Sequence, residues 1–294
     1  MKIFPDPPRF ADEVIRSCKR TNDYRPIIFE WYQHVMMLAN EVSLISFESP
    51  SVRQLNRLQH IVLAGLLFRC SRLMNSVALI SRNGEFGETT AILDRCIFES
   101  SIKVVWLCRS GTYDKFVRFM ANGLKADVCL KNEIEKEIKS RGGAVLEIEN
   151  RMLKSIENFL EISNLSEEDV RDCKCLPRFD IMMREIGESD LGYIVGQKIN
   201  SHFVHGTWSG MLHHCLKVGD DGLLHVGRSR CQTHFSQYLG TALQVVVAVY
   251  AYCEWMFDQS TAKVFKDALQ FVYDEVLKVE QSAMGRDFDE VNGT

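Results

Sequence analysis

The apolar stretch AILDRCIFESS contains a pair of opposite charges that could take part in acid–base chemistry. A helix would place Arg95 and Glu99 on one face, because residues four apart are neighbours on a helix surface. Glu99 is expected in a partly buried environment, where burial raises a carboxyl pKa and the nearby arginine lowers it. The pair is therefore either part of a catalytic site or a structural ion pair.

A second candidate group lies in the later segment GQKINSHFVHG. Its members share one helical stripe through spacings of three, four and seven residues: Lys198, Ser201, His202 and His205. Gly206 is expected to end this helix, so that the helix dipole favours a protonated His205. Together with Glu99, these groups could serve general acid–base catalysis. The alternatives are capping and core hydrogen bonds, or a metal site on His202 and His205 without an obvious third ligand. We expect no cofactor.

The segment from Ser51 to Arg82 contains several arginines and no acidic residue. Its candidates for binding phosphate are Arg53, Arg57, Arg69 and Arg72. They could form a basic strip for an RNA backbone, or they could pair with some of the 39 acidic side chains elsewhere. The formal net charge of −4 excludes a protein that coats nucleic acid in bulk.

Two of these motifs together resemble a known group of proteins. GETTAILDRCIFESSIKVVWL, followed later by YIVGQKINSHFVHGT, is similar to uncharacterised, mostly prokaryotic helical proteins that share a domain of unknown function. The resemblance covers roughly residues 50–257, and the matching positions are Arg95, Glu99, Tyr193, Ser201, His205 and Gly206. This group has no agreed activity, so the resemblance implies a helical fold without naming a reaction.

A more distant resemblance is to the HEPN superfamily of helical ribonucleases, which use an arginine and a histidine, usually across a dimer interface. Lys198 stands at the arginine position, with six residues between it and His205, and it lacks the bidentate fork of an arginine. The resemblance implies a homodimer that binds or cleaves RNA or a nucleotide in a defence or stress system. In a metal-independent ribonuclease, His205 would handle the 2′-hydroxyl proton, while Lys198 and Arg95 would stabilise the phosphate charge.

A competing hypothesis belongs to another class of function. The protein would be a non-catalytic sensor, or a module that binds a partner protein. Arg95, Glu99 and His205 would then form a buried structural network.

Proline placement and apolar spacing predict an all-α fold, a bundle of long antiparallel helices. Five of the six prolines lie at or before residue 50, which leaves the rest of the chain free to form long helices. Helices are expected over about 10–20, 27–46, 51–82, 88–109, 112–140, 144–162, 178–186, 190–204, 232–257 and 260–283, with a short one capped by Ser166. We expect an N-terminal helical extension over 1–50, a main domain over 51–285 and a frayed tail over 286–294.

The ten cysteines include no C-x-x-C pair, and most lie in apolar stretches, which predicts free thiols in the core. The first residues lack the charged and apolar regions of a signal peptide. The most apolar window, Leu243–Phe257, is shorter than the roughly 20 residues that span a bilayer. We therefore expect a cytoplasmic protein without a transmembrane span.

Overall fold

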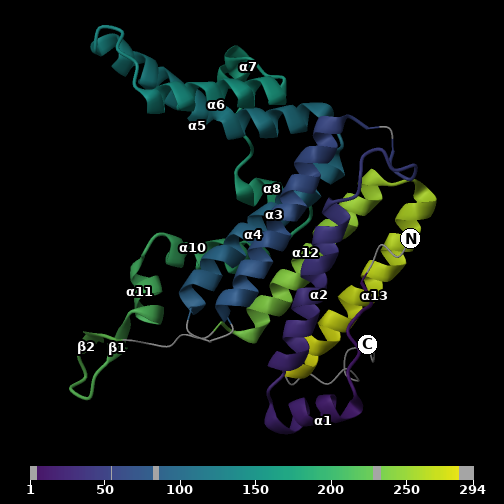
Figure 1. Ribbon diagram of the computed structural model, residues 1–294. Helices are drawn as coiled ribbons and strands as arrows, with labels where there is room; N and C mark the ends of the chain where they lie inside the picture. Colours follow the sequence, from purple (N-terminus) through teal and green to yellow (C-terminus); the bar gives the residue numbers. More distant parts are fainter. Residues whose placement is uncertain (1–4, 54, 82–85, 228–232, 285–294) are drawn as a thin grey trace. The chain divides into compact units, whose positions relative to one another are not determined.

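The computed structural model describes residues 5–53, 55–81, 86–227 and 233–284 (Figure 1). Its regular secondary structure is helical apart from one two-stranded hairpin and a single β-bridge between Val52 and Phe257. The all-α prediction is therefore confirmed. The chain forms two compact units, one of residues 1–109 and 180–294 and one of residues 110–179. The division into an N-terminal extension and a main domain stays a prediction, and the expected tail lies outside the described residues.

The helices have bounds close to those expected from the sequence. The first unit contains α1 (Asp12–Thr21), α2 (Arg25–Ser43), α3 (Arg57–Ser81), α4 (Gly87–Ser110), α8 (Phe179–Glu185), α9 (Asp190–Tyr193), a π-helix η1 (Ile194–Ile199), α10 (Asn200–Val204), α11 (Trp208–His214), β1 (Leu216–Val218), β2 (Leu224–Val226), α12 (Phe235–Met256) and α13 (Gln259–Ala283). The second contains α5 (Tyr113–Ser140), α6 (Glu147–Ser163) and α7 (Glu167–Asp172).

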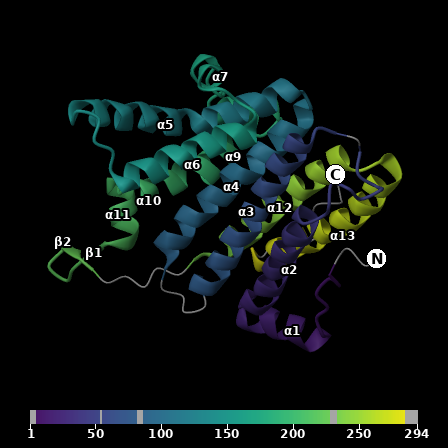
Figure 2. The same ribbon diagram turned by 45° about the horizontal axis from the view of Figure 1, so that its top comes forward.

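The core of the first unit lies where α2 packs against α3 and α12, and α12 packs against α13 (Figures 1 and 2). Each of these helices buries an apolar stripe, which on α12 includes Val245, Val249 and Tyr252. Helix α4 joins this core through α3, because the Cys70 thiol lies 3.8 Å from the Ile97 carbonyl oxygen. The centre of α4 is therefore held among buried neighbours.

The arginine-rich helix begins later than the sequence predicted. It starts at Arg57 rather than Ser51, and the Asn56 side chain caps it by accepting a 2.8 Å hydrogen bond from the Leu58 backbone N–H. Arg53 lies before the helix, where its backbone N–H donates to the carbonyl oxygen of Met256 over 2.9 Å. The expected end of this helix, at residue 82, lies outside the described part of the chain.

Two helices bear on the predicted absence of a membrane span. By length and composition, α3 and α12 could each cross a bilayer, although 44% and 56% of their most apolar windows is buried inside the fold. Buried core helices pass the same test, so the absence of a span stays a prediction.

The second unit is held by a small apolar cluster of Ala121, Val128, Ile156, Leu160 and Val170. The predicted cap at Ser166 is confirmed, because its hydroxyl accepts from the Asp169 backbone N–H. The sequence did not predict that residues 173–175 lie against α5. Their carbonyl oxygens accept hydrogen bonds from the side chains of Arg118, Asn122 and Lys125 of that helix.

The cysteines follow the core prediction only in part. All nine described cysteines are free; Cys18, Cys70 and Cys253 are buried, whereas Cys129, Cys175 and Cys215 are exposed. The exposed thiols lie on polar helix faces or beside turns, where apolar neighbours in the sequence do not imply burial in the fold.

The single helix expected over 190–204 is interrupted by the π-helix η1. Such widened turns are rare and occur often at functional sites. Gly196 lets this backbone lie directly on the Phe98 ring of α4, since a Cβ at Gly196 would lie 2.5 Å from Phe98 Cζ. The sequence also did not reveal α11 or the antiparallel β1–β2 hairpin, in which Leu216 pairs with Val226.

Gly196→Ala tests this close approach. The added methyl must displace the Phe98 ring or the backbone, and overpacking of this kind costs about 1–3 kcal/mol of unfolding free energy. Gly65→Ala is the control, because nothing lies within 4 Å of a Cβ at this exposed position of α3; it should stabilise the protein by roughly 0.5–1 kcal/mol. Denaturant unfolding measures both, and equal effects of the two substitutions would contradict the packing described.

Candidate functional site

Glu99 is the centre of a polar network that joins α4 to η1. Its Oε1 atom lies 3.1 Å from Arg95 Nε and accepts a 2.8 Å hydrogen bond from Gln197 Nε2. Lys103 Nζ lies 3.8 Å from the other carboxylate oxygen. The side chains of Arg95 and Glu99 are 18% and 27% exposed, so the pair is partly buried. The predicted ion pair is present, and it fastens η1 to α4 through Gln197.

The other predicted acid–base residues do not join this network. Ser201 Oγ donates to the Gln197 carbonyl oxygen over 2.7 Å, and His202 Nδ1 lies 2.7 Å from Thr207 Oγ1. His205 is exposed at the end of α10, and the exposed Lys198 lies with its Nζ 5.4 Å from the Tyr193 ring centroid. Because η1 changes the helical spacing, the expected stripe is interrupted. In the described residues no hydrogen bond or ion pair joins any of the four to Glu99.

The predicted phosphate-binding arginines are all exposed: Arg53, Arg57, Arg69 and Arg72. Within the described ranges none of them forms an ion pair or a side-chain hydrogen bond, so the predicted pairing with distant acids is not seen there. Their binding of phosphate stays a prediction. For a metal site, the described part of the chain offers no group of three or more His, Cys, Asp or Glu side chains that could hold an ion.

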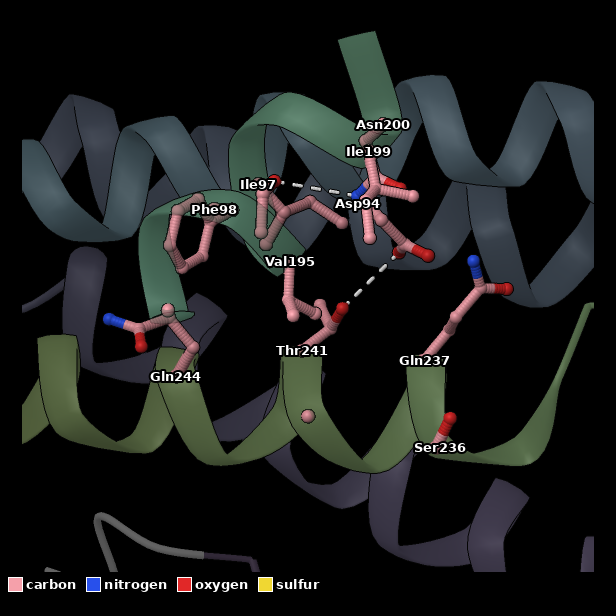
Figure 3. A pocket seen from close by; sticks show the side chains of 13 residues that line it. Asp94, Ile97, Phe98, Val195, Ile199, Asn200, Ser236, Gln237, Thr241 and Gln244 are labelled. Carbon is pink, nitrogen blue, oxygen red and sulfur yellow. Dashed lines mark hydrogen bonds between the residues drawn. The ribbon is translucent and has the colours of Figure 1, made fainter. Parts of the chain in front are cut away.

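A cavity of about 310 Å³ lies between α4, η1 and α12, next to the Glu99 network. Its lining comes from Asp94, Ile97, Phe98, Gly192, Val195, Gly196, Ile199, Asn200, Ser236, Gln237, Gly240, Thr241 and Gln244 (Figure 3). Gly240 is exposed, and nothing lies within 4 Å of a Cβ placed there. The cavity is therefore open to a molecule that enters past α12.

Asp94 is the ionisable group of this lining, and only 5% of the residue is exposed. One carboxyl oxygen accepts a 3.3 Å hydrogen bond from Thr241 Oγ1, and the other is buried without a partner. Burial raises the pKa of Asp94 to about 7, and the Thr241 hydrogen bond opposes that shift. The sequence contained a signal for this site, because Asp94 stands at helical spacing between the buried Ala91 and Ile97.

The lining has a polar and an apolar part. In Figure 3 the carboxyl of Asp94 points toward Thr241, and the amides of Asn200 and Gln237 are drawn at the same end. Phe98 and Val195 supply apolar surface, and the Gln244 Nε2 atom is buried without a partner. Lysine, arginine and histidine do not occur among the lining residues. This arrangement can bind a small molecule that brings a hydrogen-bond donor to Asp94.

Asp94→Asn tests the burial of the carboxyl through the pH dependence of stability. Because the pKa of Asp94 is about 7 in the folded chain, the folded state keeps a proton that the unfolded chain loses near its ordinary pKa of 3.8. The contribution of Asp94 to stability therefore falls as the pH rises from about 4 to about 7 and is level above that. The asparagine variant, which cannot ionise, should be more stable than the parent by about 2–4 kcal/mol at pH 8.

Near pH 4 the two proteins should have similar free energies of unfolding, because both carry a neutral group at position 94. Denaturant unfolding at the two pH values measures the difference. The other titrating groups are the same in both proteins and cancel in that comparison. A difference that does not change with pH would contradict the raised pKa.

Residues 60–223 match a family that is described as one of unknown function, DUF5677. The matched segment includes Asp94, Glu99 and Gln197, and it ends before α12, which supplies the third wall of the cavity. No curated protein and no solved structure matches the chain. Because the match covers more than half of the sequence, the protein belongs to the DUF5677 family of unknown function.

Proposed function

We propose that the protein is a non-catalytic binding module that senses a small molecule in the cavity between α4, η1 and α12. The observation that carries this proposal is the Asp94 carboxyl, which lines the cavity and has one buried oxygen without a partner. Native proteins rarely leave a buried polar atom unsatisfied, so such an atom in an open cavity favours an incoming donor. The cavity lies at the lower end of the volumes that hold small ligands.

The Glu99 network supports a structural role for the predicted charge pair within this module. Gln197, in the middle of η1, donates to Glu99, while Val195, Gly196 and Ile199 of the same π-helix line the cavity. The network therefore holds one wall of the binding site in place. A ligand that shifts η1 would also strain this hydrogen bond, which gives the module a physical route for reporting occupancy.

Filling the mouth of the cavity tests the binding function. Gly240→Leu places an aliphatic side chain at the open position of α12, and Gly65→Leu adds the same side chain to the exposed face of α3. We expect some members of a panel of single-ring aromatic compounds with neutral, cationic or anionic groups to raise the melting temperature of the parent and of Gly65→Leu. Gly240→Leu should lose these shifts. The proposal is wrong if no compound shifts the parent, or if Gly240→Leu responds equally.

A second candidate is RNA binding by the α3 arginines, as in the HEPN-like homodimer that the sequence suggested. It is supported by the exposed guanidinium groups of Arg57, Arg69 and Arg72, none of which is in an ion pair in the described residues. The ribonuclease version, the homodimer and a cytoplasmic location stay predictions.

Salt-dependent binding of single-stranded RNA tests this second candidate. If the arginines contact phosphates, the triple variant Arg57→Gln/Arg69→Gln/Arg72→Gln should bind more weakly, with a slope of log affinity against log salt smaller by about 0.7 for each lost contact. An unchanged slope would exclude the α3 strip. The ribonuclease version predicts in addition that the parent cleaves the RNA and that His205→Ala abolishes the cleavage; full cleavage by that variant would exclude His205 as the acid–base group.

A further inference from the structure

The charge of the cavity limits which ligands it can accept. Its lining contains one carboxyl, Asp94, and no cationic side chain. In the described part of the chain Asp94 also has no ion-pair partner, since the neighbouring Arg95 is engaged with Glu99. Above pH 7, where Asp94 is ionised, an anionic ligand would bring a second negative charge to the carboxylate without any compensating cation, and the lining therefore disfavours it.

A ligand with a cationic group would pair with the Asp94 carboxylate, which has no ion-pair partner among the described residues. Buried charges are ordinarily paired, and a lone carboxylate in a low-dielectric site is costly in free energy. An ammonium group has three N–H donors. The lining offers oxygen acceptors for them on Asp94, on the Thr241 hydroxyl and on the amides drawn at the same end in Figure 3, Asn200 and Gln237.

The rest of the ligand must be apolar, because the lining away from Asp94 is largely hydrocarbon. Ile97 and Phe98 of α4 face the cavity together with Val195 and Ile199 of η1. A polyhydroxylated ligand would leave its hydroxyls without partners against these side chains, whereas a ring or a short alkyl chain would gain from burial.

We propose that the cavity binds a small primary amine, with its ammonium group at Asp94 and its hydrocarbon body against Phe98, Val195 and Ile199. This inference rests on the proposed binding function and adds the chemical class of the ligand. Asp94 is the pairing group, Thr241 and the two amides orient the ammonium group, and Gly240 leaves room for entry.

Isothermal titration calorimetry with matched probes tests the ligand class. The probes are 2-phenylethylamine, 2-phenylethanol and 3-phenylpropionate, which share a ring and differ in charge. At pH 8, where Asp94 is ionised, we expect the amine to bind the parent protein at least about tenfold more tightly than the alcohol, a difference of roughly 1.4 kcal/mol, and the acid not to bind. Asp94→Asn should remove the preference for the amine, and Gly240→Leu should prevent binding of both.

The pH dependence provides a second readout. The amine remains protonated below pH 9, so its affinity should follow the ionisation of Asp94. Affinity should rise about tenfold per pH unit up to about pH 7 and then level off, while that of the alcohol should not rise. Tyr32 of α2 is the other titratable group that interacts with Asp94, and burial holds its pKa well above its ordinary value, so it stays neutral across this range.

The outcomes separate the ligand class from the proposed function. If the alcohol binds as tightly as the amine, and Gly240→Leu abolishes the binding of both, the amine assignment is wrong and the proposed binding function is supported. If the amine binds equally well to Asp94→Asn, the assignment is also wrong. If none of the panel compounds or probes binds in a manner that depends on Gly240, both proposals are overturned. Melting curves of each variant confirm that it is folded before titration.

Discussion

The burial of the Asp94 carboxyl in the middle of α4 is the constraint around which the rest of the site is arranged. Helix α4 packs on α3 at Ile97 and faces α12 at Thr241, so Asp94 is held in the core with only 5% of the residue exposed. A single weak hydrogen bond from Thr241 compensates one of its two oxygens. The protein therefore keeps an uncompensated acid beside an open cavity, which destabilises the empty fold at neutral pH and leaves free energy available for binding.

Two carboxylates five residues apart on α4 have opposite environments. The negative charge of Glu99 is already paired, because Arg95 and Lys103 lie beside its carboxylate and Gln197 donates a hydrogen bond to it. Asp94, in contrast, forms no ion pair with any cationic side chain among the described residues. The π-helix η1 separates these two environments, because Gln197 points to Glu99 while Gly196 and Ile199 line the cavity. A regular α-helix in place of η1 would change which side chains face each of them.

Much of the fold was accessible from the sequence, because helical apolar spacing and the early prolines are local signals. The Arg95–Glu99 pair was accessible for the same reason, since both residues lie on one helix. The π-helix was not, because its widened turn depends on the close approach of Gly196 to Phe98, a tertiary contact. The sequence pattern therefore gives the histidine stripe a regular helical spacing and does not reveal Gln197 as the partner of Glu99.

Asp94 shows a second reason why the site could not be predicted fully from the sequence. Its place in the buried stripe of α4 is readable from the sequence, but the identity of its neighbours on α12 is not. Thr241 and Gln237 are far along the chain, and their approach to α4 follows from the packing of the whole first unit. Sequence reasoning favoured the charged residues that could form pairs, whereas the structure singles out the acid that has no pair.

The pKa of the Asp94 carboxyl in the ligand-free protein is the most direct test of its burial without a partner. Carbon-13 NMR of the side-chain carboxyl, assigned by comparison with Asp94→Asn, reports its titration in the ligand-free protein. We expect a midpoint near 7, because the carboxyl is desolvated and unpaired. A midpoint near the ordinary value of 3.8 would show that Asp94 is solvated or paired, and it would contradict the central claim.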